Sequence, residues 1–133
     1  MIVRHAACNC GQLRLACEGE PVRISVCHCL ECQRRTGSVF GVQARFKRDR
    51  IAVEGDAAQY ARIAESGNRL TFNFCPQCGS TVYWQSEAAA DLIAVAVGAF
   101  ADPGFPAPAH SVWERRRHTW APLPTDMSVQ HSD

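Results

Sequence analysis

The sequence has almost no net charge. Its 14 Lys and Arg residues are balanced by 13 Asp and Glu residues, which leaves a formal charge of +1 over 133 residues. Such a chain has no global field that would draw it onto nucleic acid or an anionic membrane. Its most compact basic cluster, Arg115–Arg117, is only a local feature. We therefore expect no nucleic-acid partner.

Long apolar runs are also missing. The longest apolar-leaning stretch, Ala88–Phe100, contains Asp91 and is too short to span a bilayer. The first residues, Met1–Cys8, lack the apolar segment of a secretory signal. These absences predict a protein without membrane attachment, located in the reducing cytoplasm.

The sequence contains no long amphipathic helical pattern and no internal repeat, and this favours a mainly β fold. Short β-branched and aromatic runs separated by glycine-containing turns predict the strands. A short helical turn is expected over Glu31–Thr36, ended by Gly37. The predicted strands are Gln12–Cys17, Val22–Val26, Ser38–Phe46, Ile51–Glu54, Gln59–Ile63, Arg69–Phe74, Thr81–Gln85, Leu92–Val97 and His110–Glu114.

The length of the chain suits a single compact domain. We place this domain at residues 1–124. The remaining residues, 125–133, form a polar tail that we expect to fray. A β-rich domain of this size could pair through an exposed strand edge, so a homodimer is one possible state.

Cysteine, in contrast, is abundant, with eight residues. In a reduced compartment, short repeated cysteine spacings indicate metal binding rather than disulfides. Seven of the cysteines fall into three clusters, and Cys17 stands apart. The clusters are Cys8-Asn-Cys10-Gly11, Cys27-His28-Cys29-Leu30-Glu31-Cys32 and Cys75-Pro-Gln-Cys78-Gly79.

The third cluster has the form of a zinc knuckle. In Cys-Pro-X-Cys-Gly, a tight turn aims two thiolates at one point, and the glycine permits the backbone conformation that follows. A closed structural zinc site needs four ligands, so a second pair must come from elsewhere. Cys8 and Cys10 fit, because residues i and i+2 of an extended segment point to one face. We predict a structural zinc site made by Cys8, Cys10, Cys75 and Cys78.

Cys27, Cys29 and Cys32 remain as three thiolates in one short loop. Three protein ligands and one exchangeable position are the usual arrangement of a catalytic zinc, and sulfur ligands favour zinc over magnesium or calcium. We therefore predict a second, open zinc site. Cys17 is expected to be a buried core thiol, although it could be a fourth ligand, and His28 is expected to be exposed, although it could be a ligand. An iron–sulfur cluster is a further possibility.

Together the three motifs resemble those of the glutathione-dependent formaldehyde-activating enzyme family, which also includes centromere protein V. The resemblance covers the chain from about Cys8 to Trp120. It is carried by the following segments: Cys8-Asn-Cys-Gly11, Cys27-His-Cys-Leu-Glu-Cys-Gln-Arg-Arg-Thr-Gly37, Phe40 and Phe74-Cys-Pro-Gln-Cys-Gly-Ser80. It implies an Mss4-like β-tent fold with a structural zinc and a second zinc on the cysteines already grouped above.

The resemblance also implies a chemistry. Family members form S-(hydroxymethyl)glutathione from glutathione and formaldehyde, a carbon–sulfur lyase reaction. The expected partner is a small thiol such as glutathione, and Cys27, Cys29 and Cys32 would be the catalytic residues. Arg34, Arg35 and the run Arg45–Arg50 are candidates for binding its carboxylates, since guanidinium binds carboxylate in a bidentate fork. The alternative is a non-catalytic, zinc-stabilised binding module on the same fold.

Overall fold

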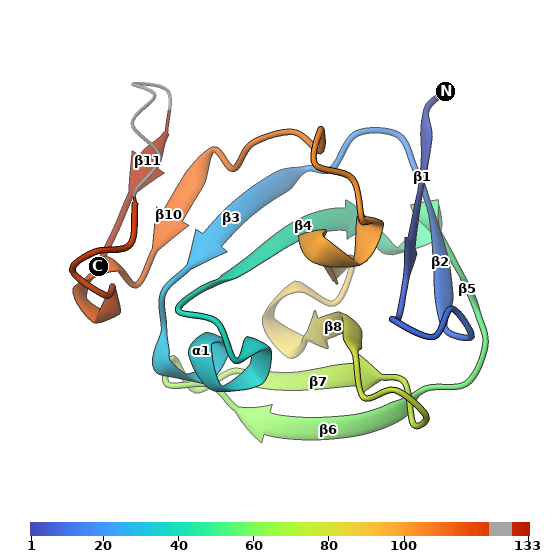
Figure 1. The fold of residues 1–133 in the computed structure, drawn as a ribbon, viewed down its shortest axis with the longest axis horizontal. Coiled ribbons are helices and arrows are strands. Elements are labelled where there is room, and N and C mark those ends of the chain that lie inside the picture. Colours follow the sequence, from blue (N-terminus) through green and yellow to red (C-terminus); the bar gives the residue numbers. More distant parts are fainter. Residues whose placement is uncertain (123–128) are drawn as a thin grey trace.

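The strands of the protein form two sheets, seen in a computed structural model that describes residues 1–122 and 129–133 (Figure 1). The smaller sheet has the order β1 (Val3–Ala7), β2 (Arg14–Glu18) and β5 (Ile51–Glu54). The larger sheet has the order β11 (Gln130–His131), β10 (His110–Val112), β3 (Arg23–Cys27), β4 (Gly41–Lys47), β9 (Leu92–Ala96), β8 (Thr81–Ser86), β7 (Arg69–Phe74) and β6 (Ala58–Ile63).

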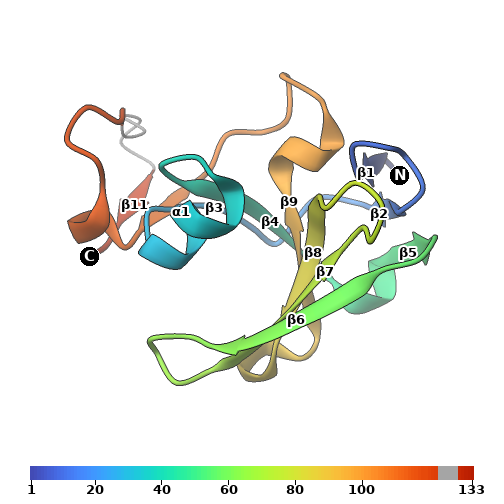
Figure 2. The same cartoon turned by 60° about the horizontal axis from the view of Figure 1, so that its bottom comes forward.

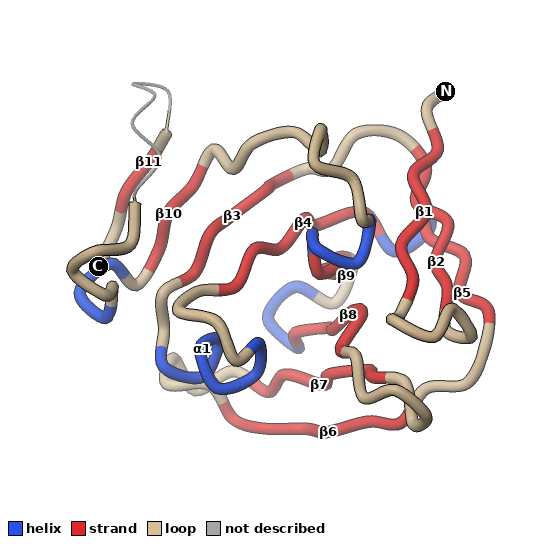
Figure 3. Tube along the Cα trace, in the orientation of Figure 1, coloured by secondary structure: helices blue, strands red, loops and turns tan. Residues whose placement is uncertain are grey.

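Helical structure is confined to short segments in the described residues, as the tube in Figure 3 shows. The α-helix α1 (Leu30–Thr36) begins at Cys29, whose Sγ accepts a hydrogen bond from the backbone N–H of Cys32. It ends at Gly37, which has the left-handed backbone (φ 71°) that glycine adopts most easily. The 3-10 turns are η1 (Arg48–Arg50), η2 (Glu87–Ala89), η3 (Val97–Phe100) and η4 (Glu114–Arg116). None of the helices in the described ranges is long and apolar enough to cross a membrane.

Most neighbouring strands pair antiparallel, but β10 is parallel to both of its neighbours. Val112 of β10 lies opposite Cys27 of β3, and Gly41 of β4 lies opposite Cys27 on the other side. The end of β3 is therefore a central position, held by strands from both halves of the chain. Figure 2 shows α1 beside this end of the sheet.

The core lies between the two sheets. The smaller sheet and the loop after β1 contribute buried residues such as Leu13, Leu15 and Cys17, and the larger sheet contributes residues such as Phe46 and Val95. A second, smaller cluster of Phe72, Trp84 and Ala94 packs separately on strands β7, β8 and β9. Apolar side chains at alternating strand positions thus fill the layer between the two sheets. Part of the larger sheet lies outside this layer and makes other contacts.

The predicted mainly β, Mss4-like single-domain fold is confirmed, and every predicted strand is present with shifts of a few residues at its ends. The helical turn ending at Gly37 is also confirmed. Two elements differ from the prediction. Strand β1 was not foreseen, and the prediction of a frayed tail is wrong for Gln130–His131, which pair with β10. Of the predicted tail, residues 125–128 lie outside the described residues, so the boundary at residue 124 stays a prediction.

Candidate metal centres and active site

The first cysteine group brings together two segments far apart in sequence. Cys8 and Cys10 follow β1, whereas Cys75 and Cys78 follow β7, and the four Sγ atoms lie within 4.8 Å of one another. Sγ of Cys10 is 3.6 Å from that of Cys8 and 3.7 Å from that of Cys75. A tetrahedral zinc with Zn–S bonds of about 2.3 Å separates its sulfur ligands by about 3.8 Å. The group could therefore hold a metal ion, and its geometry fits zinc.

Hydrogen bonds from the surrounding backbone and side chains point at these sulfur atoms. Gln12 Nε2 donates to Cys75 Sγ at 3.1 Å, and the backbone N–H of Leu13 donates to Cys8 Sγ at 3.3 Å. Hydrogen bonds from Ser80 lower the pKa of the Cys78 thiol to about 5. Donors of this kind stabilise thiolate, the form of cysteine that binds metal.

The second cysteine group is built by one local segment. Cys27 ends β3, Cys29 caps α1 and Cys32 lies in its first turn, and the three Sγ atoms are within 4.8 Å of one another. Hydrogen bonds from Cys27 and Cys32 hold the pKa of the Cys29 thiol well below its usual range. Among the described residues, no further Cys, His, Asp or Glu joins this group. It could hold a metal ion with three protein ligands.

None of the eight cysteines, all of which lie in the described part of the chain, forms a disulfide. Cys17 belongs to neither group and is fully buried in the core, as predicted for a core thiol. Burial raises the pKa of the Cys17 thiol to about 11, so it is protonated at neutral pH. The possibility that Cys17 is a fourth ligand to the second group is therefore not supported.

The expectation that His28 is exposed is wrong. Its side chain is fully buried, because its ring packs edge-on against Phe40 and its Nε2 lies 3.4 Å from Ser111 Oγ. The backbone on both sides is also held: the N–H of His28 donates to the carbonyl of Val112, and its carbonyl accepts from Gln33 Nε2. His28 thus anchors the loop that carries the three cysteines, and it is not in their sulfur group.

A cavity of about 600 Å³ opens beside the second cysteine group, and all three of its cysteines line it. This volume is in the range of small-molecule sites, roughly 300–1,000 Å³. Five arginines and two glutamates line it as well: Arg34, Arg35, Arg45, Arg62, Arg116, Glu31 and Glu65. The excess of guanidinium groups suits an anionic ligand.

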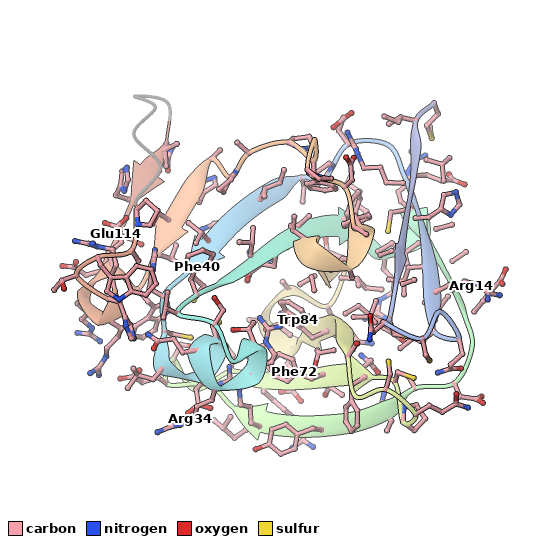
Figure 4. All side chains as sticks on the ribbon, in the orientation of Figure 1. Arg14, Arg34, Phe40, Phe72, Trp84 and Glu114 are labelled. Atoms are coloured by element: carbon pink, nitrogen blue, oxygen red, sulfur yellow. The ribbon has the colours of Figure 1, made fainter. Side chains whose placement is uncertain are left out.

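The floor of the cavity is made of aromatic rings covered by guanidinium groups. Phe72 and Trp84 lie side by side near α1 (Figure 4), with ring centroids 5.5 Å apart. The guanidinium of Arg35 lies 4.2 Å from the centre of the Trp84 ring, and that of Arg62 lies 5.2 Å from the centre of Phe72. A stacked guanidinium keeps its N–H edges free for a ligand while its face is held by the ring.

Glycine at position 41 makes room for this arrangement. A Cβ on Gly41 would lie 2.8 Å from Nη2 of Arg35, so a larger residue would displace the guanidinium. Trp113, which lines the cavity, has a left-handed backbone (φ 56°), which is rare for a bulky residue. Such strain is typical of positions held for function.

Only some of the arginines that the sequence suggested as carboxylate-binding residues line the cavity. Arg34, Arg35 and Arg45 line the cavity. In the rest of the Arg45–Arg50 run, Arg48 donates to the carbonyl of Ala90 and Arg50 lies near Glu18, both away from the cavity. Sequence reasoning did not place two further arginines of the lining, Arg62 and Arg116, at this site.

Arg62 and Arg116 reach the cavity from β6 and η4, far from the cysteine motif in sequence. Arg62 lies 4.0 Å from Glu31, and Arg116 lies 3.8 Å from Glu65. The backbone carbonyl of Arg116 also accepts a hydrogen bond from Gln33 Nε2. The basic run Arg115–Arg117 is visible in the sequence, but neither it nor the surroundings of Arg62 indicates a position beside the cysteines, which only the tertiary fold creates.

The sequence model of the glutathione-dependent formaldehyde-activating enzymes matches residues 3–116, most of the chain and both cysteine groups. The chain belongs to this family. Family membership associates it with glutathione and formaldehyde and with an enzyme-like activity on them. No curated protein matches the chain in sequence.

A solved structure supports the fold of this family member. The crystal structure of a Rhodobacter sphaeroides protein, a structural genomics target, is 20% identical and covers 77% of this chain and 90% of that chain, with a TM-score of 0.57. At this identity the likeness shows the shared fold. Similarity in substrate does not follow from it.

Proposed function

We propose that the protein binds zinc in both cysteine groups and catalyses the reversible addition of a small thiol, such as glutathione, to formaldehyde. The observation that carries this proposal is the opening of the three-cysteine group into a cavity lined by arginines. The four-cysteine group would hold a structural zinc, and Cys27, Cys29 and Cys32 would hold a catalytic one. The reverse reaction breaks a carbon–sulfur bond and would make the protein a carbon–sulfur lyase.

The reaction itself is a simple addition. The thiol sulfur forms a bond to the aldehyde carbon, the carbonyl π bond breaks, and the thiol proton ends on the former carbonyl oxygen. A zinc ion with an open position supplies Lewis acidity and stabilises a substrate thiol as thiolate.

The residues of the chain supply binding and orientation. Guanidinium groups at the cavity would hold the carboxylates of the thiol, and the walls would keep the two reactants together, which makes a bimolecular addition effectively local. Arg35 is suited to this role because its guanidinium is held by Trp84 and, within the described residues, has no carboxylate partner.

The test is the exchange rate between formaldehyde, glutathione and their adduct, measured by NMR exchange spectroscopy with purified protein. The Cys29→Ser variant should reduce the catalysed rate at least about 100-fold, since one ligand of the open site is lost. Cys17→Ala is the matched control, because it removes a thiol outside both groups. Zinc content and circular dichroism of each variant separate loss of the site from loss of fold.

Unchanged exchange in Cys29→Ser would sink the proposal. If the unmodified protein neither accelerates exchange nor binds glutathione by calorimetry, the chain would instead be a zinc-stabilised binding module.

A further inference from the structure

Strand β6 is the outermost strand of the larger sheet, and its outer edge is open. It pairs with β7 on one side, and no other strand in the described ranges pairs with it (Figure 2). Apolar and aromatic side chains on it are exposed, with Tyr60 at 59% and Ile63 at 62%. An open edge of this kind is a template on which another strand can pair.

The backbone of the β6–β7 hairpin shows which residues form this edge. The N–H of Ala64 donates to the carbonyl of Asn68 at 2.7 Å, so these two residues form a hydrogen-bonded pair. Hydrogen-bonded and non-hydrogen-bonded pairs alternate along an antiparallel ladder, and the register of β6 with β7 is continuous. Gln59, Ala61 and Ile63 therefore direct their N–H and C=O groups away from β7, and no backbone hydrogen bond from another described segment reaches them.

The other edges of the two described sheets are short or protected, as natural strand edges usually are. β11 has two residues, β1 lies against η3, and β5 has four residues and ends at Glu54, whose carboxylate pairs with Arg14 at 2.8 Å. β6 has six residues and contains neither proline nor lysine. Its one charged residue, Arg62, has its guanidinium over the Phe72 ring and does not shield the edge.

We propose that β6 is the interface of a homodimer, in which two copies of the chain pair antiparallel through this strand and join their larger sheets. The twofold axis lies at Ala61, which faces Ala61 of the second copy. In this register Gln59 lies opposite Ile63 of the second copy, so every residue with outward backbone groups has a partner within β6. An axis at Tyr60 would instead place Ile63 opposite Ala57, which lies outside the strand.

The side chains are complementary in this register. Tyr60 lies opposite Arg62 of the second copy in a non-hydrogen-bonded pair, where side chains approach most closely. Arg62 keeps its guanidinium over Phe72 of its own chain and offers its aliphatic stem to the Tyr60 ring. The cross-strand row of Trp84, Phe72 and Tyr60 then continues into the second copy.

The dimer also brings the second copy to the cavity. Arg62 and Ile63 belong to β6 and line the cavity. A twofold axis perpendicular to the joined sheet keeps the two cavities on one face, with Tyr60 of each copy beside Arg62 in the cavity wall of the other. The formal charge of +1 per chain gives little repulsion between the copies.

Sedimentation velocity with the zinc-loaded, full-length protein tests the interface. A single strand pair is a small interface, so association should depend on concentration and reach about twice the chain mass of 14.6 kDa near about 100 µM. Ala61→Lys should weaken association at least tenfold, because two ammonium groups would face each other at the axis. Ala52→Lys is the matched control, since Ala52 is an exposed alanine on the edge strand β5.

Charge complementation tests the register. Ala61→Glu should also weaken association at least tenfold, and an equal mixture of Ala61→Lys and Ala61→Glu should associate at least as tightly as the unmodified protein, because opposite charges then face each other. Failure of the mixture to associate would contradict an axis at Ala61. Circular dichroism and zinc content establish that each variant is folded.

Amide hydrogen exchange gives a readout that needs no substitution. The N–H groups of Gln59, Ala61 and Ile63 should exchange at least tenfold more slowly in the dimer than in dilute monomer, whereas those of Tyr60 and Arg62, which bond to β7, should be protected in both. Equal exchange of the first three at all concentrations would count against pairing through β6.

A protein that stays monomeric at about 100 µM would overturn the inference. A dimer that Ala61→Lys leaves intact, or that Ala52→Lys dissociates as strongly, would also overturn it. These measurements use no thiol and no aldehyde, so the dimer stands or falls separately from the proposed function.

Discussion

Gln12 connects the first cysteine group to the loop after β5. Its Nε2 donates both to Cys75 Sγ and to the carbonyl of Asp56, at 3.1 and 2.7 Å, and its Oε1 accepts from the N–H of Asp56 at 2.9 Å. Gly55 makes this contact possible. It has a φ of 96°, and a Cβ there would lie 1.9 Å from the carbonyl oxygen of Gln12.

Gly55→Ala is therefore expected to destabilise the protein by more than about 3 kcal/mol, since backbone strain and a clash with backbone add. Gly67→Ala is the control. Gly67 has a similar φ of 92°, but a Cβ there meets nothing within 4 Å, so only strain of about 1 kcal/mol is expected. Urea denaturation measures both changes. Equal losses in the two variants would contradict the close packing at Gln12.

The role of single cysteines is tested by metal content. Cys10→Ser should remove one zinc per chain and lower Tm, because a four-ligand site loses a thiolate. Cys17→Ala should keep the zinc content of the unmodified protein and cost about 1–2 kcal/mol of stability, as a small cavity in the core would. Elemental analysis and thermal denaturation give both quantities. Loss of zinc from Cys17→Ala would show that Cys17 is a ligand.

Motif spacing placed the cysteines in groups, because each pair or triplet lies in one turn or loop. The surroundings of these groups depend on distant residues. His28 is buried by Phe40 and Ser111, and the cavity gains Arg62 from β6, and neither contact leaves a local pattern. For the same reason, the sequence suggested Arg48 and Arg50 as readily as Arg45.

At the scale of elements, β10 and the C-terminal strand β11 support the cysteine loop from one side. The backbone of Ser132 bonds to that of Ser111 and of Glu114, and the Glu114 carboxylate accepts from His131 Nδ1 at 2.6 Å. Although burial opposes it, hydrogen bonds from Ser111 and His131 keep the pKa of Glu114 below its usual range. Ser111 in turn contacts His28.

This arrangement predicts a pH-dependent contribution to stability. Because the folded-state pKa of Glu114 is depressed, its contribution is present above the unfolded value of about 4.3 and is lost as the pH falls through the folded value. Glu114→Gln should thus cost about 1 kcal/mol at pH 7 and less near pH 3, below the unfolded value. Chemical denaturation at both pH values measures this. The control Glu18→Gln, an exposed residue 3.9 Å from Arg50, should change stability by less than about 0.5 kcal/mol at either pH.

Strands with alternating or continuous apolar residues were predictable, and those defined by distant pairing were not. Residues Val3–Ala7 mix apolar and basic side chains, and they form β1 because β2 lies beside them. Gln130–His131 have no strand pattern of their own, and their pairing depends on β10. Propensity and pattern describe a segment, whereas these two elements are set by their neighbours.

At the scale of the whole molecule, the first cysteine group joins the two sheets, since Cys8 and Cys10 follow a strand of one and Cys75 and Cys78 follow a strand of the other. The second group lies within one segment beside an open cavity. If both hold zinc, they should differ in how removal of the metal affects the fold.

A chelator titration should therefore show two stages. The first zinc should leave the three-cysteine group with little change in circular dichroism, and the second should leave with a fall in Tm of at least roughly 10 °C, because metal binding at a structural site contributes to folding. Cys29→Ser should lack the first stage only. A single stage in which both ions leave as the fold is lost would contradict the separation of the two sites.

The parallel pairing of β10 with β3 affects the order in which the two cysteine groups can form during synthesis. During synthesis, all four cysteines of the first group exist once residue 78 has been made. The loop of the second group acquires its neighbour Val112, and the contact from Gln33 to Arg116, only after residue 116 has also been made. A nascent chain can therefore bring the four cysteines of the first group together while the cavity beside the second group still lacks a wall, so this cavity takes its final form only after the first group can already close.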